Sequence, residues 1–335
     1  MEIDDVITIA DGGGGIKTMS LLREIILPSV GSIDVSMEDG AFLKDIGLVF
    51  TTDSFTVNPI FFPGGDIGRL SVFGTANDLA VMGASPDYMS IAFIIEEGFG
   101  KKDLEKIAMS IGNASNEVGI KVVCGDTKVV PRGAVDSIYI NTSGVGHLIT
   151  AKPLVAQRAN EGDEIVVSGD IGRHETAVLL ARGELGLESE IESDLAPLYN
   201  GIKALSEGDV ELVFARDLTR GGLAMALFEL ACASNTIVIV DEGSIPIDNS
   251  VISVCEILGL EPVFLACEGT FISVVKNGKK AVNILREVGY PGASLIGRLE
   301  SGKDITDIER VVMQTKIGSQ RLMPLPTGEL TPRIC

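Results

Sequence analysis

Apolar residues in the first half of the chain form short runs and helical stripes. Four runs rich in β-branched and aromatic residues are bounded by turns, which is typical of strands: 47–53, 87–95, 120–130 and 136–146. Between them, apolar positions recur at helical spacing from Ile67 to Leu79, and again from Leu104 to Val118 after Asp103, a typical N-cap. The pattern predicts two helices that stop at glycines, Gly83 and Gly119.

A polar break over residues 151–162 separates this half from a second half with a similar mixture of elements. We expect strands at 164–170, 211–217, 236–242, 270–275 and 293–299, and helices at 174–186, 222–234, 249–258 and 279–288. Strands outnumber a simple βαβ alternation, so the pattern predicts an α+β fold with two mixed domains, residues 1–150 and 151–312. Residues 313–335 contain three prolines and no periodic apolar face, so we expect a flexible tail.

Charge and composition exclude several classes of protein. The 335 residues carry 27 Lys and Arg against 47 Asp and Glu, a formal charge of −20, which argues against nucleic acid as a partner. The longest apolar stretches, such as residues 91–95, are far shorter than the roughly 18 residues that a membrane-spanning helix needs. The acidic N-terminus does not resemble an export signal, and five widely spaced cysteines fit reduced thiols, so we expect a cytoplasmic protein.

Four aspartates stand at predicted strand or helix ends beside small residues: Asp53, Asp78, Asp126 and Asp217. If they converge, their mutual repulsion requires a cation, and Mg²⁺ commonly joins carboxylates to substrate phosphates. With only two histidines in the chain, a zinc site of the usual type lacks ligands. The aspartates therefore predict a magnesium nucleotide site, although any one of them alone is equally well explained as a turn or helix cap.

Glycines support phosphate binding at one place and not at another. The run DGGGGIKTM near the N-terminus lacks the spacing of a P-loop. After Asp217, however, the segment DLTRGGLAMAL leads from a strand end through Gly221 and Gly222 into a helix, whose free amides attract phosphate.

The chain ends on a cysteine, Cys335, with nothing after it that would form a prenylation box. One interpretation is a mobile thiol that carries a group into a site. The alternative is an inert frayed end.

Taken together, four segments resemble one family. TDSFTVNPIFFPGGDIGRLSVFGTANDLAVMGA, GDTKVV, RDLTRGGLA and the terminal PRIC are similar to the hydrogenase maturation factor HypE family, within the PurM-like superfamily of AIR synthetase. The resemblance runs from Asp11 to Cys335 and implies a PurM-like fold whose first domain forms a barrel-like homodimer interface. It also implies Mg²⁺ on the four aspartates and ATP bound by a set of seven residues: Asn77, Asp78, Asp126, Thr127, Asp217, Gly221 and Gly222.

The resemblance further implies a reaction. In the family, the terminal cysteine receives a carbamoyl group from the carbamoyltransferase HypF, and ATP-dependent dehydration converts that group to a thiocyanate. The cyanide then passes to iron on a HypC and HypD complex, for nickel-iron hydrogenase. Glu268 and Lys128 match family positions near the tail, with Glu268 as the base and Lys128 orienting or stabilising charge, although either is equally well read as part of a structural ion pair.

One residue departs from the family pattern, and two alternatives stay open. Cys267 stands where the family has Asn, which weakens the assignment of Glu268; we expect Cys267 to be a small buried residue. Another PurM-like enzyme, of the selenophosphate synthetase or thiamine-monophosphate kinase type, is the first alternative. The second is a nucleotide-gated scaffold with no catalysis.

Overall fold

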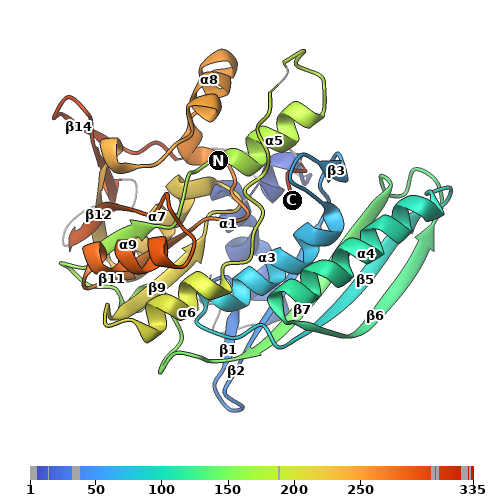
Figure 1. The fold of residues 1–335 in the computed structure, drawn as a ribbon, viewed down its shortest axis with the longest axis horizontal. Helices are drawn as coiled ribbons and strands as arrows, with labels where there is room; N and C mark the ends of the chain where they lie inside the picture. Colours follow the sequence, from blue (N-terminus) through green and yellow to red (C-terminus); the bar gives the residue numbers. More distant parts are fainter. Residues whose placement is uncertain are drawn as a thin grey trace.

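Each half of the chain builds its own sheet with helices packed on it (Figure 1). The structure is a computed structural model that describes residues 6–13, 15–31, 38–187, 189–302, 306, 309–325, 331 and 333–335. Among these residues, no helix has the length and apolar character that a membrane span requires.

The first sheet has five strands in the order β1-β2-β7-β5-β6, and only β5 and β6 run parallel. Helices α3 and α4 pack against one another beside this sheet (Figure 1). The predicted strands and both predicted helices are thus confirmed, but the predicted N-cap is wrong, because α4 begins at Lys101 after Gly100 and Asp103 lies in its first turn. The elements are β1 (Ala41–Leu43), β2 (Leu48–Phe55), α3 (Ile67–Val81), β5 (Tyr88–Glu96), α4 (Lys101–Val118), β6 (Lys121–Val130) and β7 (Ile138–His147).

The strands of the first sheet differ in how far their residues are buried. In β7, residues alternate between buried and half-buried positions, as expected for a strand with one face on the core. The edge strand β6 is different, because nine of its ten residues are exposed. The sheet is therefore open at β6, and an open edge offers unpaired backbone groups to another chain.

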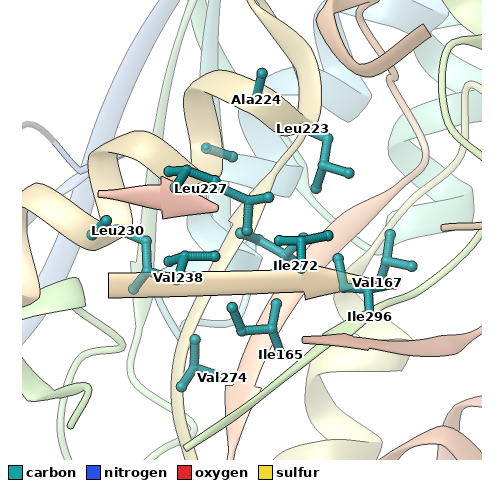
Figure 2. Packing of buried hydrophobic residues seen from close by; sticks show 14 of the residues in the cluster. Ile165, Val167, Leu223, Ala224, Leu227, Leu230, Val238, Ile272, Val274 and Ile296 are labelled. Atoms are coloured by element: carbon teal, nitrogen blue, oxygen red, sulfur yellow. The ribbon is translucent and has the colours of Figure 1, made fainter. Parts of the chain in front are cut away.

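The second sheet has seven strands in the order β14-β13-β10-β12-β8-β11-β9. Leu223, Leu227 and Leu230 of helix α7 point onto buried residues of this sheet, as Figure 2 shows. A second buried cluster lies with α6 and α9. The elements are β8 (Glu164–Val167), α5 (Arg173–Ala181), α6 (Tyr199–Glu207), β9 (Leu212–Asp217), α7 (Gly222–Ser234), β10 (Thr236–Asp241), α8 (Asn249–Leu258), β11 (Phe271–Val275), α9 (Gly278–Glu287), β12 (Ser294–Ser301), β13 (Val311–Gln314) and β14 (Gln320–Leu322).

The two domains are joined by packing as well as by the chain. Helix α3 contacts both β9 and α6 of the second domain. Short elements complete the structure: η1 (Ile9–Gly12), α1 (Ile16–Leu21), the π-helical turn η2 (Leu22–Ile26), α2 (Leu27–Val30), β3 (Phe61–Phe62), β4 (Gly65–Asp66), η3 (Ala156–Arg158), η4 (Glu242–Ser244) and η5 (Pro262–Phe264).

The segment expected to be a flexible tail differs from that expectation at both of its ends. Strand β13 runs across the predicted boundary at residue 312, and β14 pairs with it, because Val311 and Met313 are buried against β10. The last three residues return to the first domain, and Figure 1 shows the C-terminus beside α5 and β3. Pro326 and Pro332 lie outside the described residues.

Candidate functional site

A cavity of about 420 Å³ lies where the two domains meet. Its walls come from the N-terminal helical segment, β2, α3, the end of β9 and the start of α7, with Cys335 also on its surface. The lining is strongly acidic: seven carboxylates face two arginines. They are Glu38, Asp39, Asp53, Asp78, Asp217, Glu229 and Glu268, with Arg216 and Arg220.

Three of these carboxylates form a tight cluster. Oxygen atoms of Asp39, Asp78 and Asp217 all lie within 4.8 Å of one another. Thr51 links two members of the cluster, since its hydroxyl donates to Asp78 Oδ2 at 2.7 Å and lies 2.8 Å from the main-chain oxygen of Asp39. Three of the four aspartates predicted as metal ligands, Asp53, Asp78 and Asp217, therefore line one cavity.

The cluster is electrostatically strained. Burial, followed by repulsion from Asp217, Asp39 and Asp53, raises the pKa of Asp78 well above its usual range. Burial and repulsion from Asp39 do the same to the pKa of Asp217. Arg216 offsets part of this charge through contacts of 3.3 Å with Asp39 and 2.9 Å with Glu229. Clustered carboxylate oxygens are the donor set that Mg²⁺ prefers, so these residues fit a divalent ion.

Asp126, Thr127 and Lys128 lie apart from the cavity of the single chain, so their predicted contact with the nucleotide stays a prediction. All three lie on the exposed edge strand β6, and none of them lines the cavity. Lys128 Nζ instead forms an ion pair with Asp126 at 2.9 Å, and the hydrogen bond to Lys128 lowers the pKa of Asp126. The sheet order is the physical reason, because β6 is an outer strand and the cavity lies beside β2.

Asn77 has a structural role in this chain. Its amide nitrogen donates to the main-chain oxygens of Ala196 (3.1 Å) and Glu268 (3.2 Å), and its side-chain oxygen accepts from Leu198 N at 2.8 Å. The side chain is buried and its donors are used by the second domain. Asn77 therefore ties α3 to the segment that carries Glu268, and its role as an ATP contact stays a prediction.

The two glycines stand where the sequence predicts them, at the start of α7. Gly221 is the N-cap, with φ +80°, and Gly222 has φ +57°. A Cβ on Gly222 would lie 2.6 Å from the main-chain oxygen of Leu265, so the backbone passes too closely for any side chain. Gly222 lines the cavity, and its amide donates to the main-chain oxygen of Thr219 at 2.9 Å, so the amides available to a metal-bound phosphate are those of the next residues of the 13-residue helix.

The last three residues are held in a groove between the domains. Thr56 N donates to the main-chain oxygen of Cys335 at 2.9 Å, and Asn58 N donates to that of Arg333 at 3.1 Å. On the other side, His174 Nε2 lies 3.0 Å from the main-chain oxygen of Ile334. The contacts come from the residues that follow β2 and from α5, so the docked tail contacts both domains.

Docking places the terminal sulfur among charged groups. Arg220 Nη1 lies 3.5 Å from Cys335 Sγ. Burial raises the pKa of Cys335 to about 12, against the opposing effect of Arg220, so the docked thiol is neutral at pH 7. A neutral thiol is a poor nucleophile. The docked position therefore suits a sulfur that already carries a group.

Glu268 lies in the cavity wall near this sulfur. It is 3% exposed, and its Oε1 has no hydrogen-bond partner among the described residues. Burial, then repulsion from Asp217 and Asp53, raises its pKa well above the usual range. Its neighbour Cys267 is fully buried and accepts from Gly172 N at 3.1 Å, so Cys267 fills the core as predicted.

Sequence reasoning missed Asp39 and Arg220. Asp39 precedes Gly40 and a short strand in the segment MEDGAFL, so it shares the signal of the four predicted aspartates, an acidic residue beside small residues at the end of an element. Arg220 stands inside the predicted motif DLTRGG, between Asp217 and the two glycines.

Comparisons with known proteins agree with this architecture. The AIR synthase related protein N-terminal domain matches residues 37–148, and the corresponding C-terminal domain matches residues 160–308. Carbamoyl dehydratase HypE of Rhodobacter capsulatus is 40% identical over 342 residues, which cover 99% of each chain.

Two solved structures share the fold over nearly the whole chain. A hydrogenase maturation protein HypE in complex with ATP is 38% identical with a TM-score of 0.82, covering 98% of this chain and 100% of that one. HypE from a HypE-HypF complex is 40% identical with a TM-score of 0.86, covering 92% and 100%. The chain therefore belongs to the AIR synthase related proteins and, among them, to the carbamoyl dehydratase family HypE.

Proposed function

We propose that this protein is an ATP-dependent carbamoyl dehydratase that acts on its own terminal cysteine and supplies cyanide for the iron of nickel-iron hydrogenase. One observation carries the proposal: Cys335 docks on the wall of an acidic cavity between the domains, beside Glu268 and across from the Asp39, Asp78 and Asp217 cluster. A scaffold that uses its tail only as a docking peptide has no need to bring the terminal sulfur to these carboxylates.

The reaction activates a poor leaving group. The carbamoyl oxygen on Cys335 attacks the γ-phosphorus of ATP, and ADP leaves. Loss of two N–H protons and departure of the oxygen as phosphate then leave S–C≡N, so one carbamoyl group and one ATP give thiocyanate, ADP, phosphate and one net proton. Phosphoryl transfer depends mainly on positioning and on charge neutralisation.

Different residues of this chain would bind the metal ion, bind the phosphate and remove the proton. Asp39, Asp53, Asp78 and Asp217 would hold Mg²⁺, which supplies neutralisation of the phosphate charge when bound. The start of α7 offers the amides that follow Gly222 to a phosphate, whereas the amide of Gly222 itself donates to the main-chain oxygen of Thr219. Glu268 is the candidate base, since its Oε1 has no hydrogen-bond partner among the described residues and burial raises its pKa, which makes it a stronger base than an ordinary carboxylate.

We also propose that a second copy of the chain completes the site. The exposed edge strand β6 carries three exposed valines, Val122, Val123 and Val129, beside Asp126, Thr127 and Lys128. Pairing through this edge would cover the valines and form the barrel-like interface. Asp126 and Lys128 would then reach a nucleotide from the interface rather than from within one chain.

The partners follow from the same reaction. A solved relative is a HypE-HypF complex, and we propose that HypF likewise loads Cys335 here with a carbamoyl group. Because the docked Cys335 is held by Thr56 and its sulfur lies on the cavity wall with a raised thiol pKa, we expect the tail to undock for loading. A HypC and HypD complex would then accept the cyanide. The five free cysteines among the described residues suit the reducing cytoplasm.

Mass spectrometry of the intact chain tests the proposal. Incubation with HypF, carbamoyl phosphate and ATP should add a carbamoyl group to Cys335, and this adduct should then lose one water in an ATP-dependent step. Cys335→Ser should abolish the adduct and keep ATP binding, while Cys124→Ser, a change at an exposed thiol on β6, should keep both steps. An adduct that forms and never loses water would instead favour the scaffold.

A further inference from the structure

The guanidinium of Arg220 faces the cavity with most of its donors unused. Among the described residues, its one hydrogen bond is to Cys335 Sγ, at 3.5 Å. Arg220 is one of two arginines on the cavity wall, and the other, Arg216, is committed to Asp39 and Glu229. An arginine offers five N–H donors in a planar fork, and a neutral thiol sulfur is a weak acceptor. The docked free thiol therefore leaves Arg220 poorly satisfied.

Glu268 presents the opposite chemistry on the same wall. Its buried Oε1 has no partner among the described residues, so an acceptor stands in the cavity without a donor. Arg220 offers N–H donors and Glu268 offers an acceptor without a partner, and a primary amide has both a C=O acceptor and N–H donors to match them. A carbamoyl group on Cys335 would offer its C=O to Arg220 and its N–H groups to Glu268.

We propose that Arg220 recognises the carbamoyl oxygen on Cys335, so that the loaded tail docks more tightly than either the free thiol or the thiocyanate product. This inference rests on the proposed function. A carbonyl oxygen bound to the carbon next to sulfur lies within reach of a guanidinium that already contacts the sulfur. The thiocyanate has no N–H donor, and its nitrile nitrogen is a weaker acceptor than an amide oxygen and lies at the end of a linear group. Dehydration therefore removes the contact with Glu268, weakens the contact with Arg220 and favours release of the tail.

Backbone amides of the groove report how often the tail is docked. Thr56 N and Asn58 N donate to the main-chain oxygens of Cys335 and Arg333, so their hydrogen exchange is slowed only while the tail is in place. Three forms of the full chain are compared in a Cys124→Ser background: free thiol, carbamoylated with cyanate, and cyanylated. Cyanate serves as the probe because the S–H adds across the C=N bond of isocyanic acid with no other product.

The carbamoylated form should show about 10- to 100-fold slower exchange at Thr56 and Asn58 than the other two forms, the range expected for a charge-assisted hydrogen bond. Arg220→Met should reduce that difference to less than about twofold. Comparing loaded with unloaded tails within each variant cancels any general loss of stability. Arg298→Met, which removes an exposed ion pair with Glu300 on β12, should keep the full difference.

The result that overturns the inference is a full difference in Arg220→Met, or no difference in the unsubstituted chain. Adding ATP to the carbamoylated chain separates this result from the proposed function. Loss of water with no preferential docking would refute recognition by Arg220 and keep the dehydratase. Preferential docking with no loss of water would keep the recognition and refute the dehydratase.

Discussion

Asp78→Asn removes one charge from the cluster at the centre of the cavity. Asp39, Asp78 and Asp217 lie within 4.8 Å of one another, and at an effective dielectric of about 20 two unit charges at that distance repel by roughly 3 kcal/mol. Raised pKa values of Asp78 and Asp217 mean that partial protonation already relieves some of this repulsion. We therefore expect the ion-free variant to be more stable than the unsubstituted protein, by about 1 to 3 kcal/mol.

The same change should weaken nucleotide use. Asparagine keeps an oxygen that accepts from Thr51, so the local hydrogen bond survives, while the cluster loses part of its affinity for Mg²⁺. Unfolding by denaturant, with and without Mg²⁺ and ATP, measures both effects, alongside the rate of ATP turnover. Stabilisation by Mg²⁺ and ATP should fall sharply in the variant, and turnover should fall at least tenfold, about 1.4 kcal/mol.

A matched control is Asp209→Asn, whose side chain is fully exposed and, among the residues that the structure describes, forms an ion pair with Lys280 alone. This variant should keep both the response to Mg²⁺ and the turnover. A destabilised ion-free Asp78→Asn protein that retains normal turnover would refute the view that this cluster is a strained cation site.

Two further predictions concern acidity and assembly. Burial raises the pKa of Glu38 to about 7, so the folded protein binds more protons than the unfolded chain and the free energy of unfolding falls as pH rises from about 4.5 to 7; Glu38→Gln should flatten that slope in titrations of stability, and an unchanged slope would contradict the assignment. Val123→Glu on β6 should convert a dimer to monomers in light scattering and lower ATP turnover, whereas Ile317→Glu, at a residue 90% exposed, should change neither; a Val123→Glu protein that stays dimeric would refute pairing through β6.

Local pattern predicted most of the fold. The alternation and β-branched residues of β2, β5 and β7, and the apolar stripes of α3 and α4, depend on short stretches of chain, and the structure has these elements where the pattern puts them. The segment after Val312 was harder to predict, because β13 and β14 are short and gain their stability from pairing with β10. Prolines near the end predicted a tail, and strand pairing at long range overrode that prediction.

In the candidate site, too, residues marked by a local sequence pattern could be predicted, and contacts between distant parts of the chain could not. Asp53, Asp78 and Asp217 could be found because each ends or interrupts an apolar run beside small residues. Asp126 carries the same local signal, yet sheet order puts it on an outer strand, and sheet order is not encoded in any one segment. The hydrogen bonds of Asn77 could not be predicted for a related reason, since its partners Ala196, Leu198 and Glu268 lie more than 100 residues away in the chain.

The most direct test of the account follows the carbamoyl oxygen. If Cys335 brings its carbamoyl group to ATP in the cavity between the domains, a chain loaded with ¹⁸O-labelled carbamoyl should transfer that label to inorganic phosphate in a single turnover. The account predicts one ¹⁸O atom in each phosphate formed with a thiocyanate. Label that appears in water, with unlabelled phosphate, would contradict it.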